Sequence, residues 1–73
     1  MAKGEQFESD VKMLKAVYVE EGKASMLVAL QELCKVKGLA FWIGVALLDG
    51  VYHALVPGDT REARLERNRL AKL

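Results

Sequence analysis

The sequence predicts an all-α fold, made of a helical hairpin, a third apolar helix and a charged C-terminal helix. Glycine and proline divide the 73 residues into four pieces, with breaks at Gly22, Gly38 and the pair Pro57-Gly58. In the first three pieces apolar residues recur at helical spacing. Hydrophobic residues make up 52% of the sequence, somewhat above the usual share in a soluble domain. We therefore expect one domain over residues 1–73, with residues 1–4 as a flexible N-terminus.

The first two pieces predict a pair of antiparallel helices joined at Gly22. Residues 5–21 carry one apolar stripe, and residues 23–37 carry a second one that ends at Gly38, a residue suited to the position just after a helix. Ser25 is the expected N-cap of the second helix. The two stripes consist of Phe7, Val11, Leu14 and Tyr18, and of Met26, Leu27, Leu30, Leu33 and Cys34.

The third piece, residues 39–56, has two interpretations. As a helix it has an apolar stripe, and small residues four apart that would let another helix approach closely. As two strands it would turn at Asp49-Gly50, a dipeptide typical of β-hairpins, and the fold would be α+β and winged-helix-like. We favour the helix. Its stripe consists of Phe41, Val45, Leu48, Tyr52 and Leu55, and its small residues are Ala40, Gly44, Ala46, Gly50 and Ala54.

The fourth piece predicts a charged helix over residues 61–73, with Asp59 as its N-cap and Glu62 completing a capping box. Its few apolar residues form a poor stripe, so we expect a mostly solvated helix that frays. On this interpretation, deleting residues 61–73 leaves the core folded.

Composition excludes several classes of protein. One Cys rules out an intrachain disulfide framework, and one Cys with one His cannot complete a structural zinc site. The sequence contains neither a glycine-rich phosphate loop nor a G-x-S-x-G motif. Cys34 lies on an apolar stripe and is expected to be a core residue. We therefore expect no enzyme activity, no cofactor and no metal.

The N-terminus is polar and mixed in charge, without the pattern of a secretory signal, so we expect a cytoplasmic protein. Residues 39–56 are just long enough to span a membrane. They include Asp49 and His53, and a carboxylate in mid-bilayer is costly, so a membrane location is not expected.

Three groups of residues are candidates for a functional role. The apolar segment offers an interface, and within it Asp49 and His53 form a polar pair at i, i+4 spacing. Arg61, Arg64 and Arg67 recur every third residue along one side of the last helix and form a candidate anion-binding set. The interface set consists of Phe41, Trp42, Gly44, Leu48, Gly50 and Tyr52.

These features predict a non-enzymatic homo-oligomer that binds, and inhibits or scaffolds, another macromolecule, as small accessory proteins of phages and plasmids do. A third helix that is apolar on nearly all sides needs burial on nearly all sides, and self-association supplies it. One alternative is a regulator that binds nucleic acid through a winged-helix-like fold or the arginine-rich last helix. However, the net charge of only +1 is low for that class. A second alternative is a protein that sequesters a small anionic ligand with arginines at subunit boundaries.

Overall fold

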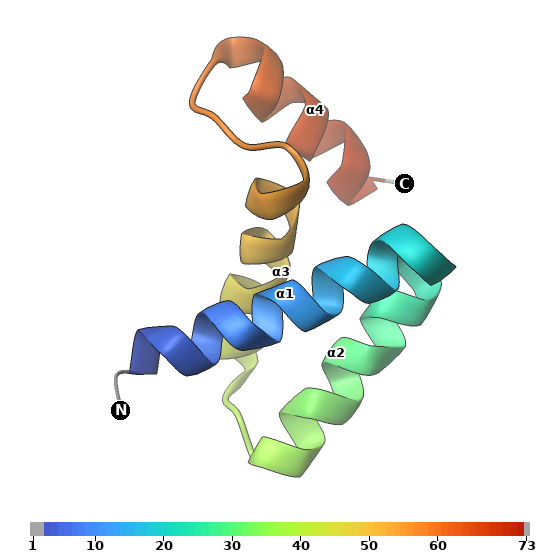
Figure 1. The fold of residues 1–73 in the computed structure, drawn as a ribbon, viewed down its shortest axis with the longest axis vertical. Helices are drawn as coiled ribbons and strands as arrows, with labels where there is room; N and C mark the ends of the chain where they lie inside the picture. The colour runs from blue at the N-terminus through green and yellow to red at the C-terminus, as the bar shows by residue number, and fades with distance from the viewer. Residues whose placement is uncertain (1–2, 73) are drawn as a thin grey trace.

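The computed structural model describes residues 3–72, which form four α-helices and no strand (Figure 1). The helices are α1 (Lys3–Glu21), α2 (Lys23–Lys37), α3 (Phe41–Leu55) and α4 (Arg61–Lys72). The all-α prediction is confirmed. The expected flexible N-terminus falls partly outside the described residues, which exclude residues 1 and 2, while Lys3 and Gly4 already belong to α1.

The β-hairpin alternative for residues 39–56 is wrong, because Asp49-Gly50 lies inside α3. Interior glycines cost a helix about 1 kcal/mol each relative to alanine. Burial outweighs that cost here, since α3 places Leu47, Val51 and Tyr52 in the protein interior.

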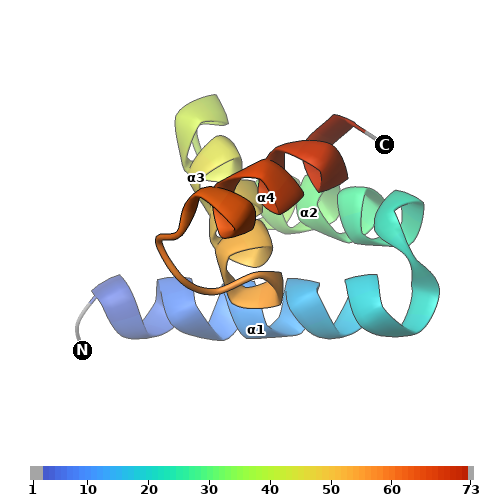
Figure 2. The same cartoon turned by 90° about the horizontal axis from the view of Figure 1, so that it is seen from above.

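The helices pack around α3. The antiparallel pair α1–α2 lies against it, with α1 crossing α3 on one side, as the two perpendicular views show (Figures 1 and 2). Five fully or nearly buried side chains form the core between these three helices: Leu14, Met26, Leu30, Leu47 and Val51.

The last helix, α4, adds no side chain to this core and packs against α3 alone among the helices. A link to α2 comes from Lys23, whose Nζ donates to the carbonyls of Leu70 and Ala71, each at 3.1 Å. The lysine thereby supplies a cation to the C-terminal end of α4.

Two of the predicted N-caps are wrong, although both helices begin at the predicted residues, Lys23 and Arg61. The second helix begins directly after Gly22 (φ 100°), so Ser25 lies inside it rather than capping it. The last helix is capped by Thr60, not Asp59: the Thr60 Oγ1 accepts a hydrogen bond from the Ala63 amide at 3.1 Å. The predicted stop at Gly38 is confirmed, since this residue adopts the left-handed conformation (φ 63°).

The crossing of α1 and α3 occurs at Gly50. A Cβ atom on this residue would lie 2.9 Å from Cγ2 of Val11, closer than real Cβ atoms approach other atoms. The small residue predicted to admit another helix therefore admits α1 of the same protein molecule.

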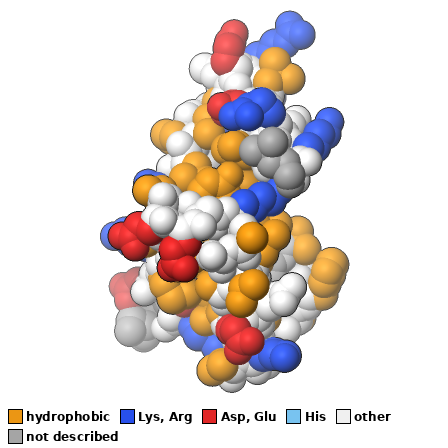
Figure 3. Space-filling view, turned by 90° about the vertical axis from the view of Figure 1, so that its right-hand side faces the viewer, with side chains coloured by type: hydrophobic (Ala, Val, Ile, Leu, Met, Phe, Trp, Pro, Cys, Tyr) orange, Lys and Arg blue, Asp and Glu red, His pale blue; other side chains and the backbone are white. Residues whose placement is uncertain are grey.

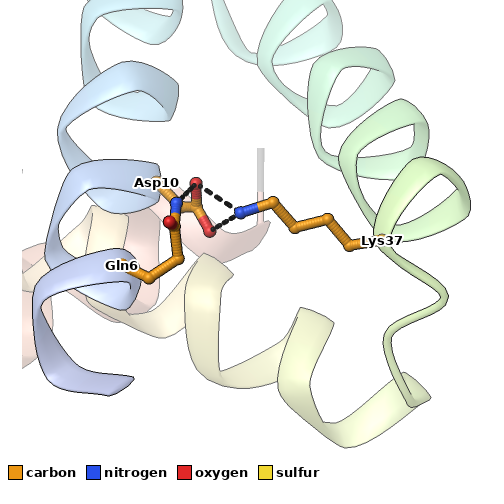
Figure 4. Close-up of polar contacts among 3 residues, drawn as sticks. All are labelled: Gln6, Asp10 and Lys37. Atoms are coloured by element: carbon orange, nitrogen blue, oxygen red, sulfur yellow. Dashed lines mark hydrogen bonds and ion pairs between the residues drawn. The ribbon is translucent and has the colours of Figure 1, made fainter. Parts of the chain in front are cut away.

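A partly buried ion pair joins α1 to the end of α2 (Figure 4). Asp10 is only 9% exposed, and both of its carboxylate oxygens accept hydrogen bonds from Lys37 Nζ, at 3.0 and 3.2 Å. Gln6, one turn earlier on α1, donates to the same carboxylate at 3.1 Å. These three contacts satisfy a charge that would otherwise be costly to bury.

Gly50→Ala should lower the free energy of unfolding by up to about 2 kcal/mol, because overpacking against Val11 costs about 1–3 kcal/mol and outweighs the roughly 1 kcal/mol that alanine gains over glycine inside a helix. Thermal and urea unfolding would measure the change. The control is Gly4→Ala, where a Cβ meets nothing within 4 Å. In a Val11→Ala background the Gly50→Ala penalty should vanish. Equal stabilisation by both glycine substitutions would contradict the tight crossing.

Lys37→Met should lower the free energy of unfolding by about 1.5–3 kcal/mol, the usual contribution of hydrogen bonds to a charged group. It leaves the Asp10 carboxylate with only the Gln6 amide. Lys12→Met is the matched control, because Lys12 is exposed on α1, lies outside the groove between α2 and α3 described below and has no ion pair within residues 3–72, so a change below about 0.5 kcal/mol is expected. Urea unfolding curves that coincide for the two variants would refute a stabilising role for the ion pair.

Candidate functional site

The first turns of α3 carry large apolar side chains that the other described residues leave exposed. Phe41 is 88% exposed, Trp42 73% and Val45 50%. Further along the same helix, Leu47 and Val51 are almost fully buried. We call Phe41, Trp42 and Val45 the apolar face. Three uncovered large apolar residues within two helical turns form a continuous patch, which is typical of an interaction surface.

A groove of about 590 Å³ lies beside the apolar face, between α2 and α3. Phe41 and Val45 belong both to the apolar face and to the wall of the groove. The polar residues that line the groove are Gln31 and Lys35 of α2. Cys34 also lines the groove, half-buried and packed against the core, in keeping with its predicted role as a small apolar residue. The remaining lining residues are Leu30, Leu39, Ala40, Gly44 and Leu48.

The six residues predicted as an interface do not share one surface. Phe41 and Trp42 are exposed, and Leu48 lines the groove. Gly44 faces Cys34 of α2, where a Cβ would lie 3.2 Å from Sγ, and Gly50 faces α1. Tyr52 is buried. Val45 was missing from the predicted set, although its spacing of four from Phe41 places both side chains on one side of the helix.

Asp49 and His53 come together as their spacing predicts, with His53 Nε2 3.5 Å from Asp49 Oδ2. Their side chains are 70% and 54% exposed, respectively. The pair therefore lies on the surface of α3, where an ion pair contributes little to stability.

The three candidate anion-binding arginines differ in their surroundings. Arg61 and Arg64 are exposed and have no ion pair within residues 3–72. Arg67 is only 8% exposed, and its Nη1 donates to the carbonyl oxygens of Val56 and Gly58. The expectation that the last helix is simply solvated therefore needs correction at Arg67 and at the buried Ala63.

Lys and Arg side chains gather over α4, at the top of Figure 3. One of these arginines is neutralised locally. Arg69 donates to the Glu66 carboxylate, and this contact lowers the pKa of Glu66 and raises that of Arg69.

A polar cleft of about 320 Å³ separates α3 from α4. Burial raises the pKa of Tyr52 above its ordinary value of 10.0, so its hydroxyl keeps its proton at neutral pH. Sequence reasoning placed Tyr52 in an apolar stripe and did not connect it with the arginines. The cleft is lined by Asp49, Tyr52, His53, Asp59, Arg64, Arg67, Asn68 and Ala71.

Residues 3–72 do not bring together three His, Cys, Asp or Glu side chains in a way that could hold a metal ion. Over the same range, no helix combines the length and the hydropathy needed to cross a bilayer. No family model matches the sequence, and neither a curated protein nor a solved structure matches it.

Proposed function

We propose that this protein is a non-enzymatic interaction protein that pairs with a second copy of itself through the apolar face and the adjoining groove. The observation that carries the proposal is that the exposed Phe41 and Val45 line an apolar groove, and that the exposed Trp42 follows Phe41 in the same helical turn. An exposed Trp next to other exposed apolar residues is typical of the residues that dominate binding energy at interfaces.

The apolar face supplies much of the area that a stable dimer needs. A standard interface buries about 800 Å² on each partner. A buried Phe or Trp side chain removes about 150–250 Å² from water, so Phe41 and Trp42 account for roughly half of that area. Val45 and the groove walls contribute further apolar surface.

The geometry also suits a two-fold symmetric contact. In such a contact the same patch on each subunit must complement itself. Here the exposed Phe41 lines the groove of its own subunit, and the exposed Trp42 is its neighbour in α3. An aromatic side chain of each copy can then enter the groove of the other. The two-fold rotation that relates the copies makes the two contacts identical, so both grooves are filled.

Binding to nucleic acid has less support. Arg67 is only 8% exposed, so its guanidinium is poorly placed to meet the phosphates of a duplex, and Arg69 is paired with Glu66. Of the arginines of α4, Arg61 and Arg64 remain for phosphate contacts. Two contacts give a log–log salt slope of only about −1.8 on duplex DNA, which corresponds to weak electrostatic binding.

Trp42→Ala should raise the dissociation constant of the dimer by about 30-fold or more, as expected for an aromatic anchor at the centre of an interface. Sedimentation velocity over a concentration series would measure it. The matched control is Val19→Ala, which removes an exposed apolar side chain from α1 (67% exposed) and should leave the dissociation constant unchanged. Circular dichroism would verify that both variants keep their helices.

A wild-type protein that stays monomeric at about 100 μM would overturn the dimer. A dissociation constant of that size corresponds to a binding free energy of only about −5 to −6 kcal/mol. Equal weakening by the two alanine substitutions would also overturn it. A shift of duplex DNA that Arg61→Ala with Arg64→Ala abolishes, and Trp42→Ala leaves intact, would favour the nucleic-acid alternative instead.

A further inference from the structure

The polar cleft between α3 and α4 contains a buried arginine with unused hydrogen-bond donors. Arg67 Nη1 donates to the Gly58 carbonyl at 3.0 Å and to the Val56 carbonyl, which fixes the orientation of the guanidinium. Among residues 3–72, neither Nε nor Nη2 has a hydrogen-bond partner, and no carboxylate lies within 4.0 Å of the guanidinium. The free Nε–Nη2 edge is the one that binds planar anions with two parallel hydrogen bonds.

This arrangement is unusual for a charge with so little exposure. A buried cation normally has a counter-ion, because the loss of hydration is expensive. No side-chain nitrogen or oxygen in the described part of the protein is both sealed from solvent and without a partner. The Nε–Nη2 edge therefore keeps its access to solvent, and the cleft is the solvent-accessible space that Arg67 lines.

A second buried polar group lines the same cleft. Tyr52 is 5% exposed, and its hydroxyl makes no hydrogen bond within residues 3–72. This hydroxyl also retains access to solvent. A protonated phenol is a hydrogen-bond donor, so two largely buried side chains, from α3 and α4, offer unused donors in one cleft.

The remaining lining residues select the kind of anion. Arg64 and Asn68 add a positive charge and an amide. Asp49 and Asp59 line the cleft as well, and their negative charges oppose a dianion such as phosphate. A carboxylate carries one charge and is planar, which matches the free edge of Arg67. The volume of about 320 Å³ is at the lower limit for ligand sites, so it fits a small molecule or the end of a peptide.

We propose that the cleft between α3 and α4 is a carboxylate-binding site, in which the Nε–Nη2 edge of Arg67 holds both oxygens and the Tyr52 hydroxyl donates to one of them. Arg64 strengthens the attraction from the side of the cleft. The site lies within one protomer, so it does not depend on the dimer proposed above.

The test is an NMR titration of the whole 73-residue protein, labelled with ¹⁵N, at constant ionic strength. The probes are acetate, inorganic phosphate, N-acetyl-glycylglycine and the amide of that peptide. The Nε–Hε resonance of Arg67 and the amides of residues 52–68 should shift with acetate or with the free peptide. Tighter binding of acetate identifies a small carboxylate as the ligand, and tighter binding of the peptide identifies the C-terminus of a polypeptide. Both results support the site.

Two variants assign the contacts without disturbing the carbonyls that Arg67 holds. Tyr52→Phe and Arg64→Gln should each weaken binding by about tenfold, the effect of losing one hydrogen bond or close charge to an ionised ligand. Arg61→Gln is the matched control, because it removes the same charge from α4 outside the cleft and should change affinity less than about twofold.

Several results would overturn the proposal. One is an absence of shifts at about 50 mM acetate and peptide, since binding that weak has a free energy of only about −1.8 kcal/mol. The others are a peptide amide that binds as tightly as the free peptide, and phosphate that binds more tightly than the carboxylates. Equal weakening by Arg61→Gln and Arg64→Gln would also count against it, because it would show a diffuse attraction to a basic helix rather than a site.

Discussion

The close approach of α1 and α3 at Gly50 is the constraint on which the rest of the structure depends. Because Gly50 lacks a side chain, α1 can lie directly on α3 and bury Leu47 and Val51 against Leu14. The crossing covers the middle of α3, while Phe41 and Trp42 in its first turn stay exposed. The exposure of Phe41 and Trp42 follows from where the helices cross, because none of the four helices in residues 3–72 covers them.

The helices themselves were largely predictable, because their signals are local. Breaks at Gly22 and Gly38 and the 3.6-residue period in the first two pieces depend only on neighbouring residues. The capping residues were less predictable. Both Asp59 and Thr60 are good capping residues, and the choice between them depends on how the loop returns to α3, where Arg67 holds the carbonyls of Val56 and Gly58. The 3.6-residue period alone did not decide between a helix and a β-hairpin around Asp49-Gly50. Burial of the α3 side chains against the neighbouring helices favours the helix.

The candidate sites were harder to predict than the fold. Small residues in α3 indicate close approach by a helix, but they do not say whether that helix belongs to the same protein molecule, and α1 proves to be the partner at Gly50. Arg67 sits in a strongly charged helix, where a solvated side chain is the ordinary expectation. The available signal was its spacing of four from Ala63, which places both on one side of α4. An arginine can bury its stem and direct its head group to backbone carbonyls, so burial of such a residue becomes visible only in the tertiary structure.

The apolar face and the polar cleft occupy opposite ends of α3 and share no residue. From Phe41 to Tyr52 the helix rises by about 16 Å, more than a Debye length at physiological ionic strength. Direct electrostatic influence of a bound carboxylate on the apolar face is therefore small. A ligand shifts an equilibrium only through a difference in its affinity for the two states. Arg67 holds the segment that follows α3, whereas Phe41 and Trp42 belong to the opposite end, which follows α2 through the turn at Gly38. Because the two surfaces lie at opposite ends of α3, the helix can carry an interface at one end and a ligand site at the other without either requiring the other.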